Sequence, residues 1–135
     1  MRDVAIIGIG HTKFGKADKT ALELFSEAAL QAIDDAGVDL KKIEALFQGA
    51  ALPGFEEGQV MPAAFSASEL NMCPVPATRY DGACASASIA IRDAAFWVGA
   101  GEYDMVIAGG TERALTMGTL FATRTFAMAC HAVTE

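Results

Sequence analysis

The sequence predicts an α/β layered fold with a largely parallel sheet, and three observations lead to that prediction. Apolar runs alternate with segments of helical spacing in the order β-α-β-α-β-α-β. The runs are continuously apolar rather than alternating, which is typical of strands covered on both faces. The helical segment after the third run is apolar nearly all round its axis, which predicts a helix buried between layers.

The first strand and helix are predicted from a single apolar run and a pair of capping signals. Residues 4–9 are continuously apolar and are expected to form a buried strand. Thr20 and Glu23 have the spacing of a capping box, which predicts a helix N-terminus at Thr20. Gly37 follows the last apolar residue of that pattern and is a plausible helix stop.

The remaining elements follow in alternation, separated by proline and glycine. Strands are expected at residues 43–50, 77–81 and 105–108, and helices at residues 62–70 and 84–99. The pattern dissolves after the fourth strand. The C-terminal part is therefore expected to consist of loops with one short helical turn.

The helix predicted to start at Cys84 does not suit a free-standing domain. Between residues 84 and 100 its only charged residues are Arg92 and Asp93, which are adjacent. In a single sheet covered by helices, one side of each helix meets water, so a helix apolar on all sides needs a further layer. The 135 residues do not supply that layer, and the chain is expected to be part of something larger.

Composition limits the classes of function. The length of 135 residues suits one domain, with 53% apolar and 20% charged residues. The net charge of −7 argues against nucleic-acid binding. The sequence contains no uninterrupted apolar stretch of about 18 residues, so no membrane span is predicted. The three cysteines have no CxxC spacing, which favours neither a disulfide framework nor a metal site. A cytoplasmic protein without a metal is expected.

Cys84 is the candidate catalytic residue. It lies where a strand-like segment gives way to a helical pattern, and small residues surround it. The N-terminus of a helix favours a negative charge and therefore a thiolate, which is the nucleophilic form of cysteine. A thiolate at such a turn suits acyl transfer. The alternative is a small buried cysteine without reactivity.

A glycine pair after the first strand is a weaker candidate. Gly8 and Gly10 begin the pattern of a dinucleotide-binding loop, but Lys13 stands where that pattern needs its third glycine. The next helix also begins about ten residues too late. A turn at the end of the strand is therefore expected, and a flavodoxin-like nucleotide-binding domain is disfavoured.

The histidines and the other cysteines have little support as site residues. A cysteine nucleophile needs a base, most often a histidine. His11 and His131 have no spacing that ties them to Cys84, so both are interpreted as loop residues. Cys73 and Cys130 are interpreted as packing residues.

Several motifs together resemble the thiolase family over essentially the whole chain. The segment DGACAS at residues 81–86, followed by an Ala/Ile-rich helix, is similar to the family's nucleophile motif. The segment AGGTE at residues 108–112 is similar to its Gly-Gly-x-Glu turn. Residues 4–10 and 12–15, VAIIGIG and TKFG, look most like the archaeal and bacterial branch near sterol-carrier-protein-type thiolases. Ala87 departs from the pattern, since many thiolases have glycine there.

The resemblance implies a fold and a mechanism. The fold would be five-layered, with two similar halves, and the helix after Cys84 would lie buried between two sheets. Cys84 would take an acyl group from an acyl-CoA, in thiolysis of a β-ketoacyl-CoA or in a Claisen condensation. The Cys84 backbone N–H would help to bind the oxyanion. A coenzyme A thioester would be the substrate, with no tightly bound cofactor.

The resemblance also implies partners and a division of the chain. Family members commonly form homodimers through the strand before the nucleophile, here residues 77–81. Some work with a small partner chain that has an OB-fold and a zinc ribbon. Residues 1–110 would be the N-terminal half-domain, and residues 111–135 the start of a loop domain. The family's Gly-His-Pro and Cys-Gly-Gly motifs are missing, so the base and second cysteine are not identified and the isolated chain is expected to be inactive.

Two alternatives stay open beside the acyltransferase. The first is a non-catalytic, thiolase-like interaction subunit that binds a partner through an exposed apolar face. The second is a fragment of a ketoacyl-synthase-like condensing enzyme, which shares the fold and the nucleophile. The residues that bind coenzyme A and the identity of the acyl group are not predicted.

Overall fold

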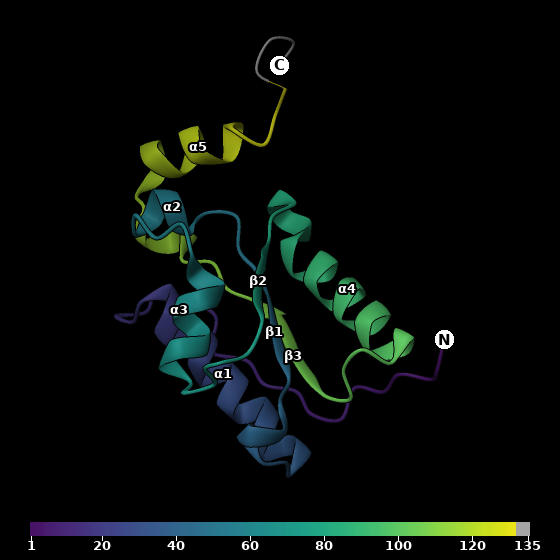
Figure 1. Ribbon diagram of the computed structural model, residues 1–135. Helices are drawn as coiled ribbons and strands as arrows, with labels where there is room; N and C mark the ends of the chain where they lie inside the picture. Colours follow the sequence, from purple (N-terminus) through teal and green to yellow (C-terminus); the bar gives the residue numbers. More distant parts are fainter. Residues whose placement is uncertain (132–135) are drawn as a thin grey trace.

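A three-stranded parallel sheet forms the centre of the computed structural model, which describes residues 1–131 (Figure 1). The strands are β1 (Ala45–Gly49), β2 (Ala77–Tyr80) and β3 (Val106–Gly110), in the order β2-β1-β3. The central strand β1 pairs in parallel with both neighbours. All three strands therefore end at the same edge of the sheet, and the loops that follow them meet there.

Helices cover both faces of the sheet. The long helix α1 (Ala21–Ala36) and α3 (Pro62–Glu69) lie on one face, and α4 (Ser86–Ala100) lies on the other (Figure 1). The short helix α2 (Pro53–Glu56) follows β1, and α5 (Thr119–Ala127) follows β3. The prediction of an α/β layered fold with a parallel sheet is confirmed.

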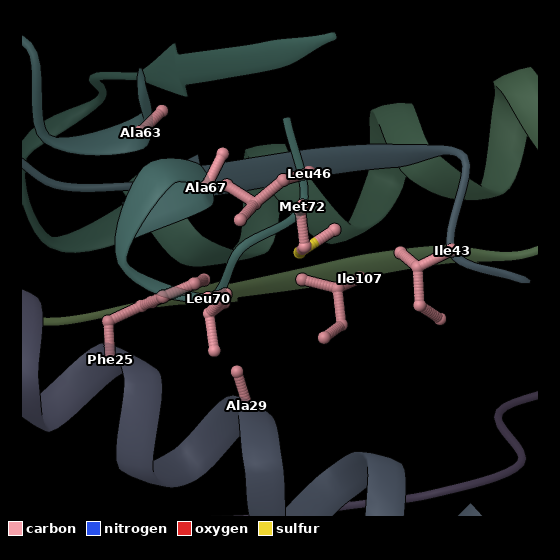
Figure 2. Close-up of a cluster of buried hydrophobic side chains, with 9 residues drawn as sticks. All are labelled: Phe25, Ala29, Ile43, Leu46, Ala63, Ala67, Leu70, Met72 and Ile107. Atoms are coloured by element: carbon pink, nitrogen blue, oxygen red, sulfur yellow. The ribbon is translucent and has the colours of Figure 1, made fainter. Parts of the chain in front are cut away.

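The larger core lies between the sheet and the helices α1 and α3. Leu46 of β1 is completely buried, and Ile107 of β3 is nearly so. Figure 2 shows how side chains from the two helices and the following loop converge on these strands. This core contains Phe25, Ala29, Ile43, Leu46, Ala63, Ala67, Leu70, Met72 and Ile107.

The second core is smaller and lies under α4. Ala90 and Ala94 of α4 pack against Phe47 on the other face of β1. The opposite side of α4 is open, with Phe96 55% and Trp97 46% exposed. The helix predicted to be buried all round is therefore covered on one side only by the described chain. Its apolar circumference exceeds what one sheet covers.

The start and the end of α1 are as predicted. The Thr20 hydroxyl accepts from the Glu23 backbone N–H, and the Glu23 carboxylate accepts from the Thr20 backbone N–H at 2.7 Å. This reciprocal pair is the capping box. Gly37 ends the helix with φ of 63°, in the left-handed region that glycine adopts without strain.

The strand predicted over residues 4–9 is wrong for the described chain. Ile6 is 79% exposed, and the backbone N–H of Ile9 donates to the Asp35 carboxylate of α1 rather than to a neighbouring strand. A Cβ atom at Gly8 would overlap the backbone of α1, so this glycine lets the segment lie directly against the helix. The segment lacks a strand because its backbone contacts are made with α1 and not with the edge of β3.

The C-terminal part contains more helix than predicted. Instead of one short turn, the chain forms a 3-10 turn at Ala114–Thr116 and the nine-residue helix α5. Residues 132–135 of the predicted loop region lie outside the described residues. None of the helices in the described part of the chain has the length and apolar character needed to cross a bilayer.

Candidate active site

Cys84 lies in an exposed turn between β2 and α4. A 3-10 turn covers Ala83–Ala85, and α4 begins at Ser86, two residues later than predicted. The difference arises because the backbone hydrogen bond in this turn joins residues three positions apart, as in a 3-10 helix. The Ala85 N–H donates to the Gly82 carbonyl at 3.0 Å. The thiol is therefore presented just ahead of the first turn of α4 rather than within it, and it is not buried in the described chain.

Side-chain hydrogen bonds fix the shape of this turn. The buried Ser86 hydroxyl donates to the Ala83 carbonyl at 2.7 Å and accepts from the Gly82 N–H at 2.9 Å. The Asp81 carboxylate accepts from the Ala83 N–H at 3.1 Å. Ala83 has φ of 50°, which is unfavourable for a residue with a side chain. The turn is thus held from both ends in a conformation that the backbone would not choose alone.

Two glycines bring the sheet edge against the start of α4. A Cβ atom at Gly49, the last residue of β1, would overlap the backbone of Ser86 and Ala87. A Cβ atom at Gly110, the last residue of β3, would lie 2.7 Å from the Ala87 side chain. Ala87 therefore fills the space between two strand ends, and the helix start is placed by this close packing.

Arg79 joins the loop after β1 to the segment before Cys84. Its Nε donates to the Ala50 carbonyl at 2.8 Å, and its Nη2 donates to the Ala51 carbonyl at 3.3 Å. The same Nη2 is 3.3 Å from the Asp81 carboxylate. A planar guanidinium can make these bonds together because its donors are arranged as a fork.

Glu112 holds the same loop from the other side. Its carboxylate accepts from the backbone N–H of Ala51 and from that of Leu52, the latter at 3.1 Å. Arg79 thus binds the carbonyls of this loop while Glu112 binds its amides. The loops after all three strands are tied together at one edge of the sheet.

A second set of charges connects α2 to the segment after β3. The Arg113 backbone N–H donates to the Glu56 carboxylate at 2.9 Å, and its guanidinium pairs with Glu57 at 2.5 Å. Glu57 also accepts from the N–H of Ala21, the first residue of α1. Both members of the Arg113–Glu57 pair are largely buried, so this pair is structural rather than a solvated surface contact.

Two carboxyls at this edge have raised pKa values. Burial is the main cause of the raised pKa of Glu112; the repulsion of Asp81 adds to it, and the Ala51 and Leu52 amides oppose it. Burial also raises the pKa of Glu56, with repulsion from Glu112 as a further cause. A carboxyl whose pKa is raised by folding binds more protons in the folded state. Its stabilising effect is therefore complete at a pH below the pKa of the carboxyl in the unfolded chain, and it is lost as the pH rises through the pKa in the folded chain.

Glu112→Gln is expected to remove part of this pH dependence. Gln keeps an acceptor oxygen for the amides of Ala51 and Leu52 but has no charge to bury. The variant should lose less stability than the wild type between pH 4.5 and 7, as measured by urea unfolding across that range. Glu69→Gln, an exposed position on α3, changes the net charge equally and serves as control. A variant less stable than wild type at pH 7 would show that the ionised carboxylate stabilises this edge.

The structure places His11 against α1 rather than beside Cys84. The His11 backbone N–H donates to Gln31 of α1, and its ring contacts the Thr12 carbonyl and stacks on Phe14. His11 is therefore held on the α1 side of the sheet. His131 is exposed at the end of the described chain.

The prediction that Cys73 and Cys130 are packing residues is wrong. Both thiols are exposed. Cys73 precedes Pro74 in the loop between α3 and β2, and Cys130 follows α5. Neither lies on a helix or strand face that turns to a core, and all three thiols of the chain are free.

Cys84 lines neither of two hollows that lie on the surface of residues 1–131. One hollow of about 590 Å³ lies beside residues 12–19, and one of about 360 Å³ beside residues 117–121 and Arg124. Within residues 1–131, no group of three or more His, Cys, Asp or Glu side chains could hold a metal ion.

Reasoning from the sequence missed the role of Arg79 in this site. The Gly-Gly-x-Glu motif contains Glu112, so a signal for that residue existed. Arg79 belongs to no motif, and its partner Ala50 is 29 positions away. Only the parallel pairing of β1 with β2 brings the two together.

Comparison with known proteins relates most of the chain to one family. The sequence model of the thiolase N-terminal domain matches residues 4–131. Acetyl-CoA acetyltransferase of Methanocaldococcus jannaschii is 41% identical over 114 residues, which are 84% of this chain and 29% of that protein. Acetyl-CoA acetyltransferase of Methanothermobacter thermautotrophicus is 39% identical over 114 residues, 84% of this chain and 30% of that protein. The chain thus spans about a third or less of the relatives it matches.

Solved structures of longer proteins contain a similar fold. An acetyl-CoA acetyltransferase from Syntrophomonas wolfei matches with a TM-score of 0.57 and 24% identity, over 73% of this chain and 26% of that chain. A 3-oxoacyl-[acyl-carrier-protein] synthase III from Aquifex aeolicus matches with a TM-score of 0.57 and 17% identity, over 64% and 28%. At these identities the likeness shows the fold alone.

Proposed function

The chain belongs to the thiolase family, as the family's N-terminal domain, and from that premise we propose that it carries the nucleophile of an acyl-CoA acyltransferase. The observation that carries the proposal is the position of Cys84. This thiol is exposed in a turn directly before a helix, at the edge where three parallel strands end. Sites in open parallel sheets form at that edge.

The proposed chemistry is transfer of an acyl group to Cys84. The thiolate attacks the thioester carbonyl of an acyl-CoA, and the oxyanion of the tetrahedral intermediate is stabilised by the Cys84 backbone N–H. The carbon–sulfur bond to coenzyme A then breaks, and the coenzyme leaves as a thiolate that takes up a proton. The acyl-cysteine is consumed by attack of coenzyme A or of a second thioester's carbanion.

The proposal assigns the base and the second cysteine to a part of the protein outside this chain. Relatives are about three times longer than the matched region, and the hydrogen bonds of His11 are with Gln31 and Thr12 rather than with Cys84. The division into a half-domain at residues 1–110 and a loop domain beginning at residue 111 belongs to the same proposal. A cytoplasmic location fits a coenzyme A thioester substrate.

Incubation of the chain with acetyl-CoA tests the proposal. We expect one acetyl group, mapped to Cys84 by peptide mass spectrometry and released by hydroxylamine, as a thioester is. Turnover should be negligible, because the proposal assigns the base and the second cysteine to a part of the protein outside this chain. A folded chain that stays unmodified, or is modified equally at Cys73 and Cys130, would contradict the proposal.

A non-catalytic interaction subunit is the second candidate, supported by the exposed apolar side of α4.

Both candidate functions include binding to partner chains. The strand β2 is the outermost strand on one side of the sheet. Its unpaired side is available for the homodimer proposed through residues 77–81. A small partner chain with an OB-fold and a zinc ribbon is proposed from the resemblance alone.

A further inference from the structure

Arg79 connects the loop after β1 to the segment that precedes Cys84. Two of its contacts are to the loop after β1, at the carbonyls of Ala50 and Ala51, with distances of 2.8 and 3.3 Å. A third is to the Val60 carbonyl, between α2 and α3, at 3.5 Å. Its fourth contact is to Asp81, at 3.3 Å. The Arg79 side chain is 27% exposed, whereas Asp81 is 55% exposed. The arginine is therefore the fixed partner and the aspartate the one that it orients.

Asp81 acts directly on the turn that contains Cys84. Its other carboxylate oxygen accepts from the Ala83 N–H at 3.1 Å. Ala83 has φ of 50°, a conformation that is unfavourable for a residue with a Cβ atom. The bond from Asp81 offsets that strain, and the next residue in the chain is Cys84. A chain of contacts thus runs from the loop after β1, through Arg79 and Asp81, to the residue that precedes the thiol.

We propose that Arg79 is a positioning residue for Cys84 and that it acts through Asp81. The inference rests on the proposed function, in which Cys84 is the acylated thiol. Small displacements of a reacting group lower the rate of an otherwise unchanged reaction, because they reduce the time spent in a reactive geometry. Lysine cannot replace the arginine, because a single ammonium group lacks the fork that binds two carbonyls and a carboxylate together.

A double-mutant cycle in a Cys73→Ser, Cys130→Ser background isolates this contact. The variants are Arg79→Met, Asp81→Ala and the combination of both. Asp81→Asn separates the two contacts of the carboxylate, since its amide oxygen can still accept from the Ala83 N–H but its NH2 group cannot accept from Arg79. Arg92→Met is the matched control: Arg92 also pairs with an aspartate on its own element, at 2.8 Å, but on the exposed surface of α4.

Two readouts are compared for each folded variant, hydrogen exchange of the Ala83 amide and the rate of acetylation of Cys84 by acetyl-CoA. Arg79→Met and Asp81→Ala should each speed the exchange about tenfold. Each should lower the acetylation rate constant about tenfold, with a change of less than about twofold in the half-saturating acetyl-CoA concentration. The exchange rate and the acetylation rate constant of the double variant should be within about twofold of those of the more affected single variant. Asp81→Asn should resemble Arg79→Met in both readouts, because both variants lose the bond from Arg79 while the acceptor for the Ala83 N–H remains. Arg92→Met should change neither readout.

Three outcomes would overturn the inference. One is an Arg79→Met variant whose Ala83 exchange rate and Cys84 acetylation rate equal those of the wild type. Another is a double variant whose effects multiply toward about a hundredfold, since the two residues would then act independently. The third is an Asp81→Ala variant that matches wild type, which decides the matter even if Arg79→Met does not fold. If wild type takes up no acetyl group, the proposed function fails, and the exchange cycle alone decides whether Arg79 positions the turn.

Discussion

Replacing Gly49 with alanine is expected to destabilise the chain by about 3 kcal/mol and to lower its melting temperature by roughly 10 °C. The added Cβ atom would overlap the backbone of Ser86 and Ala87. Backbone cannot rotate aside as the end of a flexible side chain can, so β1 and α4 must separate. Because Ser86 also bonds the turn that contains Cys84, acetylation of Cys84 should fall in the same variant.

The matched control is Gly109→Ala, at the neighbouring position in β3. Its Cβ atom would meet only the ring of Phe25, at 3.7 Å, an ordinary contact distance. That variant should stay within about 1 kcal/mol of wild type by thermal or urea unfolding. Equal destabilisation of the two variants would mean that loss of glycine, and not the overlap with α4, determines the effect.

Replacing Cys84 with alanine is expected to abolish acetyl transfer from acetyl-CoA. Serine at the same position should lower the rate by a factor on the order of 10³ or more, because an unactivated hydroxyl is a far weaker nucleophile than a thiolate. The exposed turn should tolerate both changes with little loss of stability. Incorporation of labelled acetyl groups, followed by peptide mapping, measures the effect.

The chain contains two matched controls for this experiment. Cys73 and Cys130 are also exposed and free, so alanine at either position removes a thiol of similar accessibility. Both variants should retain acetylation at Cys84. If Cys84→Ala were still acetylated at wild-type rate, the nucleophile would have to be another group, and the comparison of the three cysteines would identify it.

Most of the fold could be predicted because its signals are local. The capping box at Thr20, the stop at Gly37 and the apolar runs of β1 and β3 each depend on residues close in sequence. The failure at residues 4–9 has a different origin. An apolar run indicates that a strand is favourable, but its formation depends on a neighbouring strand edge and on covering layers. In the described chain α1 takes up the backbone of this segment instead.

The candidate site could be predicted only in part, for a similar reason. Cys84 is recognisable because a strand-like segment, small residues and a helical pattern meet at one point in the sequence. The contacts that shape its turn come from distant positions, such as Arg79 with Ala50 and Glu112 with Ala51. Those pairings follow from the register of the strands, which hydrophobic pattern alone does not specify.

The order of the strands has a consequence for handling this chain in solution. The edge strand β2 presents one side with backbone donors and acceptors that no neighbouring strand of the described chain pairs. On the same chain, Phe96 and Trp97 of α4 are about half exposed. Open strand edges and apolar surface both promote self-association, and a net charge of −7 opposes it less as salt is added. Aggregation of the purified chain should therefore increase with ionic strength.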